Sequence, residues 1–310
     1  MLNNYNDPTK AADEKMIAVS AASLDVAKIR NKYNEMQQKY EKLRSNPNQL
    51  VVFVSLDIVG SVKLKQNETF NWLNLFLEFH KTLKSFPIKQ LKNNGDEIIF
   101  AQPVSDLACI AKIIETTSKR TLQAHKNFTK LGLDKKFYVK STVWVAETGN
   151  TTRNIVIEYL TGDGFIRDYL GINVDEGFRL AGFASANTVT IDPKIVMLLA
   201  KAIKQNPKEQ VIKKCLENIV LDGCQYLKDI WPIEDAKQQK YPIFRYYTDI
   251  SDLNIRHPEL DFAKKSNHTN DDIIEMLRKI FQRAGVYEKE VKNMLQLMNI
   301  DCSLHEHNFL

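Results

Sequence analysis

The chain has 310 residues, 44% of them hydrophobic and 26% charged, which is ordinary for a globular protein and excludes a disordered or fibrous chain. Its net charge of +5 comes from scattered lysines and arginines, so it suits an anionic small substrate and argues against a dedicated nucleic-acid surface. The apolar runs are shorter than the roughly 18 residues of a membrane span, no signal-like segment opens the chain, and the cysteines have no disulfide-like spacing. We therefore expect a cytoplasmic protein with no membrane span.

Residues 1–48 are predicted to form an N-terminal extension. Between residues 20 and 45, apolar side chains recur at three- and four-residue steps among charged ones, which predicts an amphipathic helix. Asn46 and Pro47 end this pattern. The helix fits equally well as one that packs on its own domain and as a short dimerising coil, and both interpretations stay open.

Residues 49–248 are predicted to form the main domain, of the α+β class. Its first half opens with the apolar run 51–56, which is typical of a buried central strand and stops at Asp57. The elements expected next are a helix at 67–85, a strand at 86–91, a tight turn at 92–95 and a strand at 98–101. This β–α–β–turn–β order places the hairpin beside the first strand.

The second half of the main domain alternates strands with helices. The expected elements are a helix at 104–131, strands at 136–147, 154–160 and 188–191, helices within 193–220, and a strand pair at 225–231 and 241–247. No element is predicted between residues 162 and 187, where glycines and charges are interleaved. Residues 249–310 are predicted to form a C-terminal extension with two amphipathic helices, whose role is left open.

Two aspartates stand at the ends of predicted strands. Asp57 follows the apolar run directly, and Asp96 lies at the tip of the hairpin. Alone, each suits a turn or a cap, but the predicted pairing brings both carboxylates to one sheet edge. Such a pair repels unless a cation lies between the two groups, and Mg²⁺ prefers hard oxygen ligands together with phosphate oxygens. Gly60 and Ser61 add backbone N–H groups that can approach a phosphate, so the pattern predicts a two-metal nucleotide site.

These residues resemble the first two signatures of the class III adenylyl and guanylyl cyclases. Residues 56–61 (LDIVGS) match an apolar strand followed by D-I-x-G, and residues 92–96 (KNNGD) match K-x-x-G-D. The resemblance implies a ferredoxin-like, palm-type fold with a central antiparallel sheet and flanking helices. It also implies that Asp57 and Asp96 bind two Mg²⁺ or Mn²⁺ ions, with the Ile58 carbonyl as a further ligand.

The third signature of the same family is matched only in part. Residues 168–180 (DYLGINVDEGFRL) keep its arginine as Arg179, which by resemblance stabilises the transition state. Asp175 stands where the family has an asparagine that orders the ribose, so this substrate contact is altered. Near residue 228 the chain resembles the closing L-K-G segment, which makes Lys228 a candidate triphosphate contact although the glycine is missing.

The run from Asp175 to Ala184 is similar to the stand-alone pyrimidine cyclases of bacterial Pycsar antiphage systems. That resemblance implies a head-to-tail homodimer with active sites at the subunit interface. It also implies a cyclic CMP or cyclic UMP product that activates a separate effector in antiviral defence.

The base is predicted from Lys92 and Asp168, which in purine members of the family donate to a ring nitrogen and accept from an exocyclic amine. Cytosine offers the same order, with N3 accepting and N4 donating, whereas uracil reverses it and would leave acceptors facing one another at a cost of ~1–3 kcal/mol. Tyr169 and Phe178 are candidates for the bulk that narrows a pyrimidine pocket, or for core. We therefore predict CTP as substrate, with UTP, then ATP, then a catalytically inactive nucleotide-binding dimer as the alternatives.

Overall fold

The computed structural model describes residues 26–32, 34–35, 48–61, 69–132, 137–149, 154–161, 164–226, 240–247, 270–283 and 287–300. The chain divides into two units, Met1–Asn46 and Pro47–Leu310. In the first unit, residues 26–32 and 34–35 are helical and exposed, as the periodicity predicts, and the rest of the predicted helix lies outside the described residues. The domain boundaries at residues 48 and 248 stay predictions.

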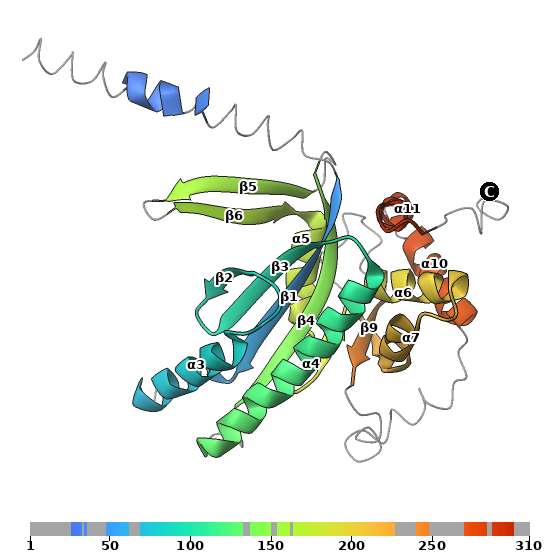
Figure 1. Cartoon of the computed structure of the whole chain (residues 1–310), viewed down its shortest axis with the longest axis horizontal. Helices are drawn as coiled ribbons and strands as arrows, with labels where there is room; N and C mark the ends of the chain where they lie inside the picture. The colour runs from blue at the N-terminus through green and yellow to red at the C-terminus, as the bar shows by residue number, and fades with distance from the viewer. Residues whose placement is uncertain are drawn as a thin grey trace, which may run out of the picture. The chain divides into compact units, whose positions relative to one another are not determined.

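The second unit is built on a seven-stranded mixed sheet with the strand order β2-β3-β1-β4-β7-β9-β8 (Figure 1). Its strands are β1 (Gln49–Val59), β2 (Gln90–Asn94), β3 (Glu97–Val104), β4 (Tyr138–Thr148), β7 (Val189–Ile191), β8 (Ile219–Tyr226) and β9 (Lys240–Tyr246). Only the β4–β7 pair is parallel among these neighbours. The prediction of an α+β fold with a largely antiparallel central sheet is confirmed.

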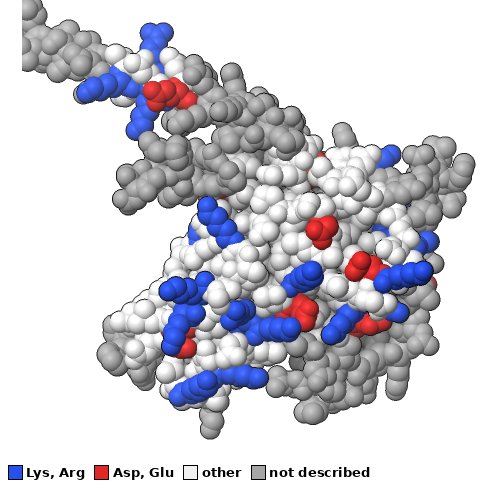
Figure 2. Space-filling model, in the orientation of Figure 1, with Lys and Arg blue, Asp and Glu red and all other residues white. Residues whose placement is uncertain are grey.

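Two layers of helix cover the sheet unequally. The main core lies under the helices α3 (Thr69–Leu83), α4 (Leu107–Lys130), α6 (Pro193–Gln205) and α7 (Gln210–Glu217). Figure 1 shows α4 crossing in front of β1 and β4, with α5 (Ile172–Ala181) behind the strands. Among the described residues on this front face, Figure 2 shows acidic side chains mixed with the lysines and arginines.

Alternation along β1 decides what each face contains. Leu50, Val52, Val54, Leu56 and Ile58 join the main core. The odd-numbered residues Val51 and Phe53 face the other way, into a small second core that α5 covers. Phe53 stacks on Trp144 of β4 with ring centroids 5.3 Å apart. Beyond this apolar half, the same face becomes polar at Ser55 and Asp57, where no core forms.

The segment 162–187 is where the sequence prediction was wrong. It contains strand β6 (Gly164–Gly171), which pairs with β5 (Asn154–Thr161) as a separate two-stranded sheet, and then helix α5. A ribbon outside the main sheet needs no continuous apolar run, so the hydrophobic pattern does not reveal it. The register of the pair runs from Asn154 opposite Gly171 to Thr161 opposite Gly164.

Three other strands also differ from the prediction. β1 does not stop at Asp57 but continues to Val59, because residues 57–59 still pair with β4. β2 begins at Gln90 and not at residue 86, and it is a polar strand at the sheet edge with a bulge between Gln90 and Lys92. The turn is accordingly confined to Gly95 and Asp96, with Gly95 at φ +78°. β8 begins at Ile219, since α7 ends at Glu217, and its register shifts near Gly223. Bulges of this kind break the two-residue period on which strand prediction depends.

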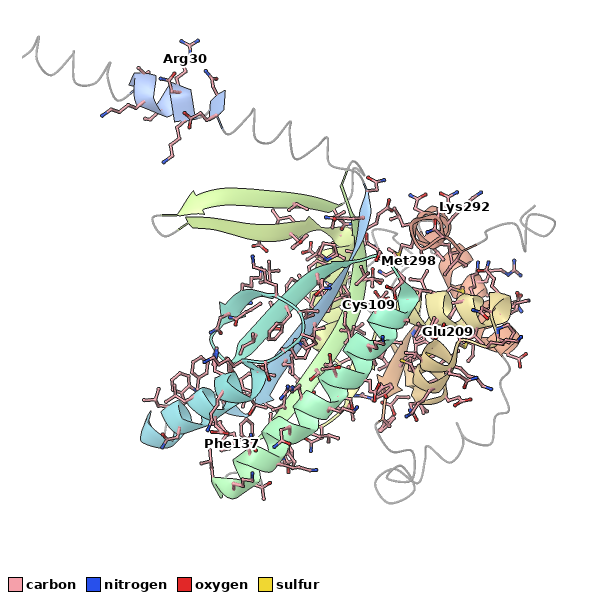
Figure 3. All side chains as sticks on the ribbon, viewed as in Figure 1. Arg30, Cys109, Phe137, Glu209, Lys292 and Met298 are labelled. Carbon is pink, nitrogen blue, oxygen red and sulfur yellow. The ribbon has the colours of Figure 1, made fainter. Side chains whose placement is uncertain are left out.

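The C-terminal helices α10 (Asn270–Arg283) and α11 (Tyr287–Leu297) confirm the two predicted amphipathic stretches. Ile274 and Leu277 of α10 and Met294 of α11 are buried in the main core. Met298, just after α11, also belongs to that core (Figure 3). None of the described helices is long and apolar enough to cross a bilayer.

Candidate active site

The polar half of the second sheet face forms the candidate site. Strand register aligns Asp57 of β1 with Glu97 of β3 on one side and with Lys140 of β4 on the other. One step along, Ser55 lies opposite Thr142. These five side chains line a cavity of about 330 Å³, which Phe178, Ala181 and Gly182 close from the α5 side. Alternation along three adjacent strands thus gathers charged groups on one wall.

Asp57 is the carboxylate at the centre of this wall. The Lys140 ammonium lies 3.0 Å from its Oδ2. Burial raises the pKa of Asp57 above its ordinary value, the bond to Lys140 opposes that shift, and the nearby charges of Asp96 and Glu97 add to it. Asp57 is therefore a partly desolvated acid with two acidic neighbours, which is an environment that favours a bound cation.

Asp96 reaches the same place from the β2–β3 turn. The backbone N–H of Ile58 donates to the Asp96 carbonyl at 3.3 Å, and the Ser61 hydroxyl donates to the Asp96 carboxylate. Gly60 adopts a φ of +88°, a backbone conformation that glycine tolerates best, and so turns the chain from β1 toward the buried Ser61. The loop after β1 and the hairpin tip are joined, with Asp57 and Asp96 on either side of the junction.

The donor set suits a hard divalent cation. Asp57, Asp96 and Glu97 supply carboxylate oxygens. The Lys140 ammonium lies among them and forms an ion pair with Asp57. Within the described residues no group of three or more histidine, cysteine or acidic side chains lies together so that it could hold a metal ion by itself. Mg²⁺ commonly takes only one or two carboxylates and completes its shell with water and substrate phosphate, so this partial set fits it. The metal roles of Asp57, Asp96 and the Ile58 carbonyl stay predictions.

The two residues predicted to read the base lie together. Lys92 of β2 donates to Asp168 of β6 at 3.1 Å, and its ammonium lies 5.4 Å from the ring centroid of Phe178. Tyr169, in contrast, is buried in the second core, where its ring meets Phe53 edge-on. Phe178 is half-buried, contacts Trp144 and lines the cavity. Of the two aromatic candidates for pocket bulk, only Phe178 faces the cavity.

Helix α5 carries the remaining predicted site residues on its outer side. Asp175 and Arg179 are one helical turn apart and exposed. Neither belongs to the described residues that line the cavity beside Asp57. The structure therefore does not bring Arg179 and Asp57 of one chain into one cavity, and the roles of Arg179 and Asp175 stay predictions.

The inner side of α5 is held against the sheet by close packing. A Cβ on Gly177 would lie 2.1 Å from the indole nitrogen of Trp144, so only glycine allows this approach. The residue before it, Glu176, is also buried, and its carboxylate accepts from the Lys194 ammonium at 2.6 Å and from the Tyr241 hydroxyl at 3.0 Å. These contacts fix which side of α5 is outermost.

The sequence prediction missed Lys140, Ser55, Glu97 and Thr142 as parts of the site. The signal for Lys140 is a lone lysine in a strand whose other residues, apart from Tyr138, are buried. It indicates a site residue only once the register of β1 and β4 is known. Lys228 lies outside the described residues.

No family model matches the chain, and no curated protein matches it either. Solved structures that are similar in fold include the guanylyl cyclase Cya2, with 9% identity over 65% of this chain and 92% of the other and a TM-score of 0.44. The adenylyl cyclase CyaB from P. aeruginosa has 12% identity over 66% of this chain and 96% of its own, also with a TM-score of 0.44. A bacterial light-regulated adenylyl cyclase has 11% identity, covers 76% of this chain and 100% of its own, and has a TM-score of 0.43.

Proposed function

We propose that the chain is a nucleotidyl cyclase that converts CTP to 3′,5′-cyclic CMP and pyrophosphate. The observation that carries the proposal is the meeting of Asp57 and Asp96 where the loop after β1 joins the β2–β3 turn, beside a cavity of about 330 Å³. The matches of residues 56–61 and 92–96 to the first two cyclase signatures support the same chemistry.

In this reaction the ribose 3′ oxygen attacks the α-phosphorus and gives up its proton to water, and the bond from the α-phosphorus to the bridging oxygen breaks as pyrophosphate leaves. Mg²⁺ or Mn²⁺ held by Asp57 and Asp96 would make the 3′ hydroxyl more acidic and neutralise charge on the leaving group. Gly60 and Ser61 lie beside Asp96, where the backbone can approach the phosphates. Lys228 is the proposed contact from the segment after β8.

The proposed base contacts are Lys92 and Asp168. Cytosine N3 accepts from the Lys92 ammonium while its N4 amine donates to the Asp168 carboxylate, so the base would replace the ion pair that the two residues now form with each other. With cytosine bound, Lys92 and Asp168 each keep a hydrogen-bond partner. With uracil bound, its O4 would face the Asp168 carboxylate and its N3–H would face the Lys92 ammonium, so these groups would be left unpaired. UTP is the second candidate and ATP the third.

The assembly we propose is a head-to-tail homodimer in which Arg179 of a second copy completes the site. The exposed position of Arg179 on α5 supports a contact outside its own chain. Its guanidinium would stabilise charge developing on the transferred phosphorus, and Asp175 would contact the ribose. The cyclic nucleotide would then activate a separate effector in the cytoplasm, as part of an antiphage defence.

Mixing two inactive variants tests this assembly. Asp57→Ala and Arg179→Ala are each expected to lose cyclase activity, and a mixture of the two should regain part of it, because one site of each mixed dimer has both residues intact. A mixture as inactive as its components would contradict the shared site.

Identifying the reaction products distinguishes a catalytic protein from one that only binds the nucleotide. Wild type, Asp57→Ala and Asp96→Ala are incubated with nucleotide and Mn²⁺, and products are identified by mass spectrometry. Turnover in wild type that both variants lose, with circular dichroism unchanged, supports the enzyme. Nucleotide binding by all three proteins without any turnover would support the inactive nucleotide-binding dimer.

A further inference from the structure

Lys140 holds a position that the proposed reaction leaves unexplained. It is the lysine that strand register aligns with Asp57, and its ammonium lies 3.0 Å from Asp57 Oδ2. The two side chains are 25% and 24% exposed, so the ion pair is partly buried. Along β4, the eight residues that follow Lys140 are all buried, and this lysine is only half-buried at the rim of the cavity.

The charges around this ammonium are unbalanced. Asp57, Asp96 and Glu97 are acidic, and the Glu97 carboxylate is held toward the wall by the Ser55 hydroxyl at 2.6 Å. Lys140 therefore compensates part of an acidic cluster that would otherwise repel itself. An ammonium on a flexible four-carbon stem can do this and can also move away, because its rotatable bonds lead out to solvent.

The Lys140 ammonium and a divalent cation bound to the Asp57 carboxylate would repel each other, because both are positively charged and lie beside the same group. We propose that Lys140 is a built-in counter-ion for Asp57, which a divalent metal must displace, so that Lys140 weakens metal binding and sets the metal concentration at which the site fills. This inference rests on the metal site of the proposed function. It assigns Lys140 a role toward the metal and none in the chemical step.

The test measures Mn²⁺ binding to the full-length protein without nucleotide, by electron paramagnetic resonance of free Mn²⁺ and by calorimetry. Lys140→Met removes the charge, and Lys140→Gln removes the charge but keeps a hydrogen-bond donor for Asp57. Both variants are expected to bind Mn²⁺ roughly tenfold more tightly, since the competing charge is gone. Lys140→Arg keeps a cation and should bind as weakly as wild type.

The matched control is Lys119→Met. Lys119 forms an ion pair of 2.7 Å with Glu115 on α4, far more exposed than the Asp57 pair. Its loss removes the same charge and should leave the Mn²⁺ affinity unchanged. A second readout is thermal stability: with a chelator present, Lys140→Met should melt at a lower temperature than wild type, and Mn²⁺ should raise its melting temperature more than it raises that of wild type.

The outcomes separate this inference from the function beneath it. If Asp57→Asn loses Mn²⁺ binding while Lys140→Met and Lys140→Gln bind no more tightly than wild type, the metal site stands and the counter-ion role is overturned. If Asp57→Asn binds Mn²⁺ as well as wild type, the metal site itself is refuted, and the role of Lys140 with it. Tighter binding in both Lys140 variants, with no change in Lys119→Met, supports the inference.

Discussion

The Lys194 ammonium lies 2.6 Å from the Glu176 carboxylate, and the two side chains are only 1% and 4% exposed. Asp192, equally buried, is 3.6 Å from the same ammonium, and the Tyr241 hydroxyl donates to Glu176. This buried cluster joins the start of α6 to the inner side of α5. It therefore connects the core to the helix that presents Arg179 and Phe178.

Removal of the cation from this cluster should destabilise the fold strongly. Lys194→Met leaves Glu176 and Asp192 buried without their counter-charge, and breaking a buried pair typically costs roughly 3–5 kcal/mol of unfolding free energy. Lys119→Met, which breaks an exposed pair on α4, should cost less than about 1 kcal/mol. Urea denaturation measures both, and equal losses in the two variants would contradict the role assigned to the buried cluster.

The protonation of Asp192 should make stability depend on pH. Burial, with a contribution from Glu176, raises its pKa from 3.8 to about 6. The folded state then binds this proton more tightly than the unfolded state, so the stabilisation is complete below pH ~4 and is lost as pH rises through ~6. Asp192→Asn cannot ionise; its amide oxygen can still accept from the Lys194 backbone N–H, but the second acceptor, which the Val145 N–H uses, is lost at every pH.

The measurement compares the unfolding free energy of wild type and Asp192→Asn from pH 4 to pH 7. Wild type should lose stability relative to the variant across this window, on the order of 2–3 kcal/mol. A difference that stays constant with pH would show that Asp192 does not titrate there.

Gly177 should be intolerant of even one methyl group. Its Cβ would lie 2.1 Å from Trp144, whose ring is buried beneath α5, so Gly177→Ala must push the helix outward. Overpacking of this kind costs typically 1–3 kcal/mol, and the shift would also misplace Phe178 and Arg179. A smaller ring in Gly177→Ala/Trp144→Phe should recover part of the lost activity. No recovery in the double variant, or full activity in the single one, would contradict this packing.

Base preference should follow Lys92 and Asp168. Replacing both by amides, as Lys92→Gln/Asp168→Asn, removes the fixed order of donor and acceptor, because each amide can present either group. We expect kcat/KM for CTP relative to UTP to fall about tenfold, within the ~1–3 kcal/mol of an unsatisfied polar group. Steady-state kinetics with each nucleotide measures this ratio, and an unchanged ratio would remove both residues from base reading.

Local signals made much of this fold predictable. The β-branched run before Asp57 and the Gly95–Asp96 turn are short patterns whose meaning does not depend on distant residues, and the structure has β1 and the β2–β3 turn there. Helix α5 escaped prediction because its inner side includes Gly177 and the charged Glu176 in place of an apolar stripe. Trp144 packs against Gly177 and Lys194 neutralises Glu176, and neither contact can be read from the local sequence.

The site shows the same division. Asp57 and Asp96 are recognisable from motifs, whereas Lys140 belongs to the site through the strand register that aligns it with Asp57, more than 80 residues earlier in the chain. The ion pair of Lys92 with Asp168 is likewise a product of β6, a strand that the hydrophobic pattern does not reveal. In both cases the contacts of the lysine depend on strands that are far apart in the sequence, so local patterns cannot predict them.

The most direct test of the central proposal is one incubation of the full-length protein with equimolar ATP, GTP, CTP and UTP and with Mn²⁺, followed by mass spectrometry of the cyclic products. We predict cyclic CMP as the main product, formed with pyrophosphate and absent when Asp57 is alanine. Cyclic AMP as the main product would contradict the pyrimidine assignment. No cyclic nucleotide at all would contradict the cyclase.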